Sequence, residues 1–67
     1  MSEIGKQIGF NIRQLREGKG ISQEQLAAKA DLHRTHIGRI ERGEKTPNVE
    51  TVHKIAKALG VEMKDLI

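Results

Sequence analysis

The chain has 67 residues, of which 36% are hydrophobic and 31% are charged, and its formal net charge is +3. This length suits one domain over residues 1–67, near the lower limit for a core that no disulfide or metal reinforces. The lack of cysteine excludes a disulfide scaffold and a zinc finger, and no apolar run approaches the length of a membrane span. We therefore expect a soluble, cytoplasmic protein.

The first predicted helix covers residues 3–18, where the glycines Gly18 and Gly20 end it. Four aliphatic residues recur at helical spacing and are predicted to face inward: Ile4, Ile8, Ile12 and Leu15. Phe10 lies about 200° around the helix from Ile8 and so falls off this stripe. It is either an isolated exposed aromatic side chain or part of a surface that binds a partner.

The second predicted helix covers residues 23–30 and has a clear start. Ser22 can cap it, and Gln25 stands three residues later, as in a capping box. Ile21 can pack on Leu26 as a hydrophobic staple, which fixes the direction from which the chain approaches the helix.

A tight turn follows, and it leads into a third helix over residues 34–42. Asp31 can adopt a left-handed backbone where glycine is absent, Leu32 fills the corner, and His33 caps the next helix. Gly43 stops this third helix as a left-handed residue.

Ile37 and Ile40 fix the orientation of the third helix, because both must face inward. At about 100° per residue, Thr35 and Arg42 then point outward. Arg39 and Gly38 lie roughly 50° to either side, and Arg34 and His36 flank the helix start. The outward face therefore carries three arginines and no acid. Glu41 falls beside the isoleucines, where an unpaired carboxylate is costly, so we expect a cationic partner for it.

Two further helical segments complete the chain. Asn48 can cap a helix over residues 49–59 that Gly60 closes, and a final turn covers residues 63–67. With no predicted strand and short connections, the fold class is all-α, a compact five-helix bundle.

Several blocks in this order resemble the single-domain helix-turn-helix proteins of the lambdoid phage repressor and Cro type (XRE-like), which include restriction-modification controller proteins. The blocks are residues 12–16, 20–27, 37–43 and 47–60. Asp31 departs from the pattern, since the family usually has a turn glycine there. The resemblance implies a lambda repressor-like domain that regulates transcription on the DNA of a bacterium or phage.

Arginine can donate two parallel hydrogen bonds to guanine, so Arg34 and Arg39 are the candidate base-reading residues. Thr35 and His36 can add base or phosphate contacts, and Arg42 and Lys45 are candidate phosphate or loop contacts. The resemblance implies two further roles. It makes Gln23 a phosphate contact and a brace for Arg34, and it pairs Arg16 with Glu41 as a structural ion pair.

The chain is expected to bind its operator as a homodimer. Two copies would place their reading helices about 34–36 Å apart on a palindromic site of double-stranded DNA. The C-terminal end supplies the predicted dimer interface, formed by Val61, Met63, Leu66 and Ile67, although Leu66 can equally belong to the core.

Other functional classes have weaker support. His33 and His36 are three residues apart, but a structural zinc site needs four ligands, so we expect no metal and no cofactor. No nucleophile has a base assigned to it, which argues against an enzyme. Two alternatives remain: a protein-binding module such as an antitoxin, whose partner is a toxin, and the DNA-binding head of a longer regulator.

Overall fold

A computed structural model describes residues 3–67 and shows an all-helical fold, with no strand in that range. Four α-helices are followed by one short 3-10 helix: α1 Glu3–Gly18, α2 Gln23–Ala30, α3 Arg34–Glu41, α4 Val49–Leu59 and η1 Met63–Asp65. The prediction of five helices is therefore wrong at the C-terminal end. Residues 63–67 form a single 3-10 turn that is too short to be a fifth helix of a bundle. The first two residues of the predicted domain lie outside the described residues.

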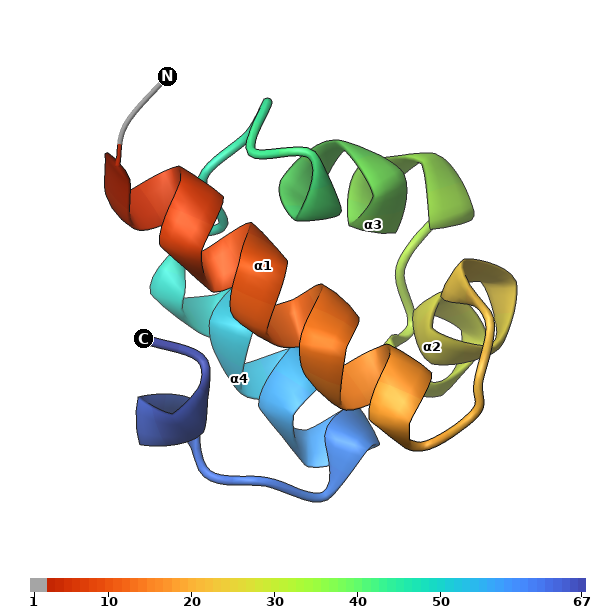
Figure 1. Ribbon diagram of the computed structural model, residues 1–67. Helices are drawn as coiled ribbons and strands as arrows, with labels where there is room; N and C mark the ends of the chain where they lie inside the picture. Colours follow the sequence, from red (N-terminus) through yellow and green to blue (C-terminus); the bar gives the residue numbers. More distant parts are fainter. Residues whose placement is uncertain (1–2) are drawn as a thin grey trace.

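The helix α1 packs against both α3 and α4, and Figure 1 shows it running across the molecule between them. Ile8 and Ile12 are buried as predicted, but Ile4 is exposed, so its predicted inward position is wrong. The reason is that Gly5, Gly9 and Arg16 are also buried. The centre of the buried stripe therefore lies about 60° around the helix axis from Ile8, on the side that faces α3. Ile4 lies on the other side of Ile8, at the edge of the stripe.

The start of α2 has the predicted capping box. The backbone N–H of Gln25 donates to Ser22 Oγ at 3.0 Å, and the backbone N–H of Ser22 donates to Gln25 Oε1 at 2.7 Å. Two donors that a helix start leaves unpaired are thus satisfied locally. The sequence alone was enough to place this boundary.

The turn between α2 and α3 has the geometry predicted from its residues. Asp31 is left-handed, with φ 57° and ψ 47°, and the N–H of Leu32 donates back to the carbonyl of Ala27. His33 caps α3, since its Nδ1 accepts a hydrogen bond from the backbone N–H of Thr35 at 3.1 Å. Aspartate thus fills the position where the resembled family has glycine, because its short polar side chain tolerates this conformation.

The helix α3 ends at Glu41, one residue earlier than predicted, and Arg42 is its C-cap. Gly43 then adopts φ +76°, as expected of the residue that stops the helix. The N–H groups of Gly43 and Glu44 donate to the carbonyls of Ile40 and Arg39 at 3.0 and 2.9 Å. These bonds fix the direction in which the following residues leave the helix.

The C-terminal part packs on α4, whose caps are Asn48 and the left-handed Gly60. Leu66 is fully buried, and its carbonyl accepts a hydrogen bond from Asn11 Nδ2 at 3.0 Å. The structure therefore assigns Leu66 to the core, and its place in the predicted dimer interface is wrong. The 3-10 turn folds the chain back over α4, which turns this side chain inward while Ile67 stays exposed.

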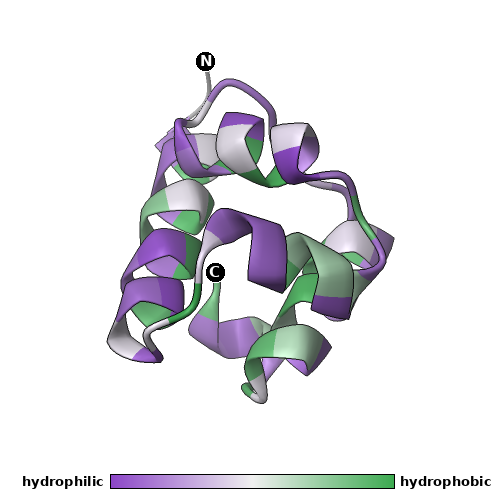
Figure 2. Ribbon diagram, turned by 90° about the vertical axis from the view of Figure 1, so that its right-hand side faces the viewer, coloured by the Kyte–Doolittle hydropathy of each residue, from purple (hydrophilic) through white to green (hydrophobic). Residues whose placement is uncertain are grey.

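The core is aliphatic, as a chain with a single aromatic residue requires. In Figure 2, hydrophobic and hydrophilic segments alternate along the helices, as in amphipathic helices. The largest fully buried side chains come from every α-helix and from the C-terminal turn: Ile12, Leu26, Ile37, Ile40, Ile55, Leu59 and Leu66. Among residues 3–67, no helix combines the length and the apolar character needed to cross a bilayer.

Candidate DNA-binding interface

The outward side of α3 carries the residues that the sequence singled out for DNA contact. Ile37 and Ile40 are buried, and the opposite side is exposed as the helical wheel requires. We call this surface the docking face and define it by its four exposed residues: Arg34, Thr35, Arg39 and Arg42. In Figure 1 α3 lies at one side of the molecule, so this face is open to a large partner.

Two shallow depressions flank the docking face. His33, Thr35, His36, Arg39 and Lys45 line the first, and Gln23, Arg34, Thr35, Gly38 and Arg42 line the second. All seven predicted DNA-contacting residues therefore lie around one helix, including Gln23 from the first turn of α2. The depressions are lined by cations and amides, which suits an anionic surface such as a sugar–phosphate backbone.

His36 has an unusual environment within the first depression. Its Nε2 is buried and has no hydrogen-bond partner among the described residues. Burial, together with the nearby charges of Lys45 and Arg39, lowers the pKa of His36 below its ordinary value. The lowered pKa favours the neutral form of His36, in which each ring nitrogen can take part in a single hydrogen bond.

The inner side of α3 is fixed to α1 by the ion pair that the resemblance implied. Arg16 Nε donates to Glu41 Oε2 at 2.7 Å, and Arg16 Nη2 donates to Oε1 at 3.0 Å. The side chains of Arg16 and Glu41 are only 11% and 2% exposed. Arg16 Nη1 also donates to the carbonyl of Ile21 at 2.8 Å, and the hydrogen bonds to Glu41 raise the pKa of the guanidinium.

Gln23 connects this inner pair with the docking face. Its Nε2 donates to Glu41 Oε1 at 3.0 Å, so the side chain is held by Glu41. The sequence analysis predicted a brace for Arg34; the hydrogen bond found goes to Glu41. Because Glu41 is itself fixed by Arg16, the position of Gln23 beside α3 is determined by the scaffold.

Two residues that shape the outer and inner sides of α3 were missed by the sequence analysis. Glu44 follows α3 and binds Arg42, so an acid does reach the docking face. Gly9 in α1 is the second, because a Cβ on it would collide with the backbone carbonyl oxygens of Ile40 and Glu41. The signal for Gly9 was available, because it stands in the interior of a helix, where glycine costs about 1 kcal/mol relative to alanine and so needs a packing reason.

Comparison with known proteins agrees with this geometry. Residues 12–66 match the helix-turn-helix family. The chain belongs to that family. It is 50% identical over 61 residues to the control protein C.BamHI of Bacillus amyloliquefaciens, covering 90% of this chain and 75% of that protein. It is 38% identical over 65 residues to the control protein C.SmaI of Serratia marcescens, covering 97% and 77%.

Solved structures show the same fold. The restriction-modification controller protein C.AhdI from Aeromonas hydrophila superposes with a TM-score of 0.91 at 36% identity, covering 94% of this chain and 96% of that one. Within the matched range, α2 and α3 are the two helices that a tight turn joins, and the docking face lies on the second of them.

Proposed function

We propose that this protein is a transcription regulator that binds double-stranded DNA by placing the docking face of α3 in the major groove. The observation that carries the proposal is the arrangement of α3. Its isoleucines are buried, and its exposed side presents Arg34 and Arg39 at positions from which side chains can reach base edges. The similarity of the chain to control proteins, over 90% and 97% of its length, supports the same function.

Within this proposal the contacts divide by chemistry. Arg34 and Arg39 read bases, and Thr35 and His36 assist them with a hydroxyl, a methyl group and a ring nitrogen. Gln23, Arg42 and Lys45 contact phosphates, which sets register and affinity without selecting a sequence. Binding is the whole of the proposed activity, and no catalytic step is assigned to this chain.

The direct test is a salt titration of binding to two duplexes: a site selected from a random pool, and a random duplex. If a dimer contacts six to ten phosphates, affinity falls roughly 10³–10⁵-fold between 50 and 200 mM salt. The selected site should bind about 10³-fold or more tightly than random DNA. Equal affinity for the two duplexes would contradict the proposal.

Two substitutions distinguish a residue that reads bases from a residue that contacts phosphates. Arg34→Ala should weaken binding to the selected site by roughly 5- to 150-fold and reduce the preference for it, because a bidentate base contact is lost. Lys45→Ala should weaken binding to both duplexes by a similar factor. It should also reduce the slope of log affinity against log salt concentration by about 0.9 per protomer. Arg13→Ala is the control, since Arg13 is an exposed arginine of α1 that pairs with Glu17.

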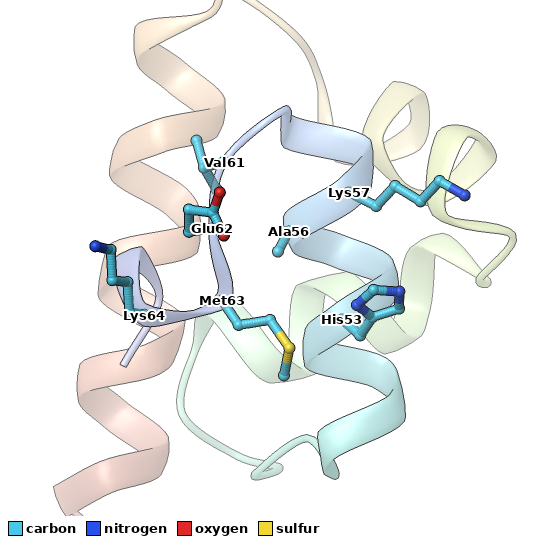
Figure 3. A pocket seen from close by; sticks show the side chains of 7 residues that line it. All are labelled: His53, Ala56, Lys57, Val61, Glu62, Met63 and Lys64. Atoms are coloured by element: carbon cyan, nitrogen blue, oxygen red, sulfur yellow. The ribbon is translucent and has the colours of Figure 1, made fainter.

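We further propose that two copies bind a palindromic operator as a repressor or controller. The candidate interface is the exposed Ile67 together with the groove between α4 and η1, which is lined by His53, Ala56, Lys57, Val61, Glu62, Met63 and Lys64. Figure 3 shows the Met63 side chain extending from the C-terminal turn toward His53 on α4. Val61 and Met63 are partly buried there against the core, and Ile67 is exposed nearby in the chain. Apolar side chains of this kind suit a contact between two copies.

The dimer proposal is tested by the mass of the protein in solution and on DNA. Ile67→Asp should shift the protein toward the monomer in sedimentation and weaken binding to the palindrome, because a charge enters the proposed contact. Ile4→Asp is the matched control, since Ile4 and Ile67 are similarly exposed, at 64% and 67%. An unchanged mass and affinity for Ile67→Asp would place the interface elsewhere.

A further inference from the structure

Another arginine–glutamate pair lies on the docking face itself. Arg42 Nε donates to Glu44 Oε2 at 2.7 Å, and Arg42 Nη2 donates to Glu44 Oε1 at 3.3 Å. Both side chains are well exposed, at 57% for Arg42 and 45% for Glu44. The pair is therefore accessible to a competing anion, and it is screened by water and salt.

The backbone fixes Glu44 in this position. Gly43 has φ +76°, which turns the chain sharply at the end of α3, and the N–H of Glu44 donates to the carbonyl of Arg39 at 2.9 Å. A side chain at position 43 would be strained in this conformation, and its Cβ would lie 2.9 Å from Lys6 Cγ. Glu44 therefore points back to the docking face as part of the helix end.

The Arg42 guanidinium lies across α3 in the space that Gly38 leaves open. Arg42 Nη1 is 3.1 Å from the position that a Cβ on Gly38 would occupy, and Gln23 Oε1 is 3.5 Å from it. With Nε and Nη2 bound to Glu44, one edge of the guanidinium is already occupied. That edge is one that a phosphate would use for a bidentate contact.

The charges on this part of the face cancel in the free protein. The hydrogen bond from Arg42 lowers the pKa of Glu44, and the charge of Arg39 acts in the same direction, so the carboxylate stays ionised. The same hydrogen bond raises the pKa of Arg42. One of the cations available for DNA is thus paired with an acid of the same chain.

We propose that Glu44 competes with DNA phosphate for Arg42, and so sets the affinity and the salt dependence of DNA binding. This inference rests on the proposed function of the docking face. A phosphate that approaches Arg42 either displaces Glu44 or meets a pair with no net charge. In both cases Arg42 and Glu44 together bring no net positive charge to the DNA. An unpaired Arg42 would bring one positive charge and release about one more counterion from the DNA. Because phosphates are the same in every sequence, the effect does not depend on the site.

The test is the variant Glu44→Gln, measured on the selected site and on random duplex between 50 and 200 mM salt. We expect binding to both duplexes to tighten by about two- to fivefold at low salt, within the range of one exposed ion pair. The salt slope should steepen by about 0.9 per bound protomer, while the preference for the selected site stays within about twofold. The exposed positions of both side chains predict a fold as stable as that of the unmodified protein.

The matched control is Glu17→Gln. Arg13 Nε and Glu17 Oε2 form a pair at 3.1 Å on α1, with side chains 62% and 51% exposed. This variant removes the same charge and frees an arginine of similar exposure away from the docking face, so the salt slope should change by much less. Glu17 Oε2 also lies 3.9 Å from Arg16 Nη2, so an unchanged melting temperature of the variant is needed to show that the Arg16–Glu41 pair is intact. Glu44→Gln in an Arg42→Gln background is the second control. There the gain should be smaller, because only the repulsion between the Glu44 carboxylate and the phosphates is removed and no cation is released.

Three results would overturn the proposal: weaker binding of Glu44→Gln, which would make Glu44 a brace for Arg42; a gain confined to the selected site; or the same gain in the Arg42→Gln background. Failure of the proposed function is a separate result, because it appears in the unmodified protein as equal affinity for the two duplexes. The effect of Glu44→Gln on random duplex can be measured in either case.

Discussion

The two sides of α3 each combine an arginine–glutamate pair with a glycine, and they differ mainly in burial. On the inner side, Arg16 and Glu41 form a bidentate pair next to Gly9, where α1 approaches α3 closely. On the outer side, Arg42 and Glu44 form a pair over Gly38, in contact with water. The same side-chain chemistry therefore appears in two very different environments.

Burial determines what each pair can do. A buried carboxylate that loses its partner has no water to replace it, so the inner pair is a permanent joint between α1 and α3. An exposed carboxylate exchanges its partner for water or another ion with little change in free energy. The outer pair is thus suited to a surface that binds and releases an anion, while the inner pair is suited to holding that surface in place.

The largest expected effect comes from breaking the inner pair. Glu41→Ala should lower the free energy of unfolding by about 3–5 kcal/mol, because it leaves the Arg16 charge buried without its main partner. For a domain of this size, that corresponds to a fall in melting temperature of at least about 10 °C. Glu44→Ala, which breaks the outer pair, should leave the melting temperature almost unchanged. A shift under about 1 °C for Glu41→Ala would contradict the comparison.

The inner glycine should also be intolerant of change. In Gly9→Ala the new methyl group would meet the backbone oxygens of Ile40 and Glu41, and backbone atoms cannot move aside as a side-chain end can. We expect a loss of about 1–3 kcal/mol in urea unfolding, typical of an overpacked contact. Gly18→Ala in the same helix is the control, because apart from its chain neighbours and its own helix backbone no atom lies within 4 Å of its Cβ position. Equal stability of the two variants would show that α1 can shift away from α3.

The outer glycine should respond in the opposite way. In Gly38→Ala the new methyl group meets Arg42 Nη1 at 3.1 Å, which is the end of a flexible, exposed side chain. We expect Arg42 to move and the free energy of unfolding to rise by up to about 1 kcal/mol, because alanine favours the helix. DNA binding should weaken in the same variant, since the methyl group stands on the docking face. A loss of stability would mean that Gly38 is a packing residue.

The sequence predicted those parts of the fold that depend on local chemistry. The capping box at Ser22, the left-handed Asp31 and the orientation of α3 all follow from residues within a few positions of each other. The predictions for Ile4 and Leu66 were wrong or open because burial there depends on how α1 and the C-terminal turn pack on distant segments. The prediction of a fifth helix over residues 63–67 was wrong for a similar reason, since a stretch of five residues is too short to show a helical repeat of apolar positions.

The residues of the docking face were likewise predicted only in part. The positions of the outward arginines followed from two isoleucines, whereas the role of Glu44 depends on the left-handed turn at Gly43, which points the acid back at Arg42. A pattern search along α3 alone finds no acid on its outward face. The contact between Arg42 and Glu44 can be recognised only when the backbone conformation at the end of α3 is known.

The smallest expected effect concerns His36, which contrasts with the fully partnered Glu41 on the inner side. His36 lies near Lys45, Arg39 and His33 in the first depression, and burial and the two cations lower its pKa below the ordinary value of 6.5. Because the unfolded chain then binds the proton more readily, the stability that His36 contributes is present above pH 6.5 and is lost as the pH falls through that value toward the folded-state pKa. Because His36 is only partly buried, the change in melting temperature should be under about 3 °C. His36→Gln should remove this step from the pH profile of the melting temperature, while the exposed His53→Gln should retain it. An unchanged profile in His36→Gln would assign the pH dependence to another group.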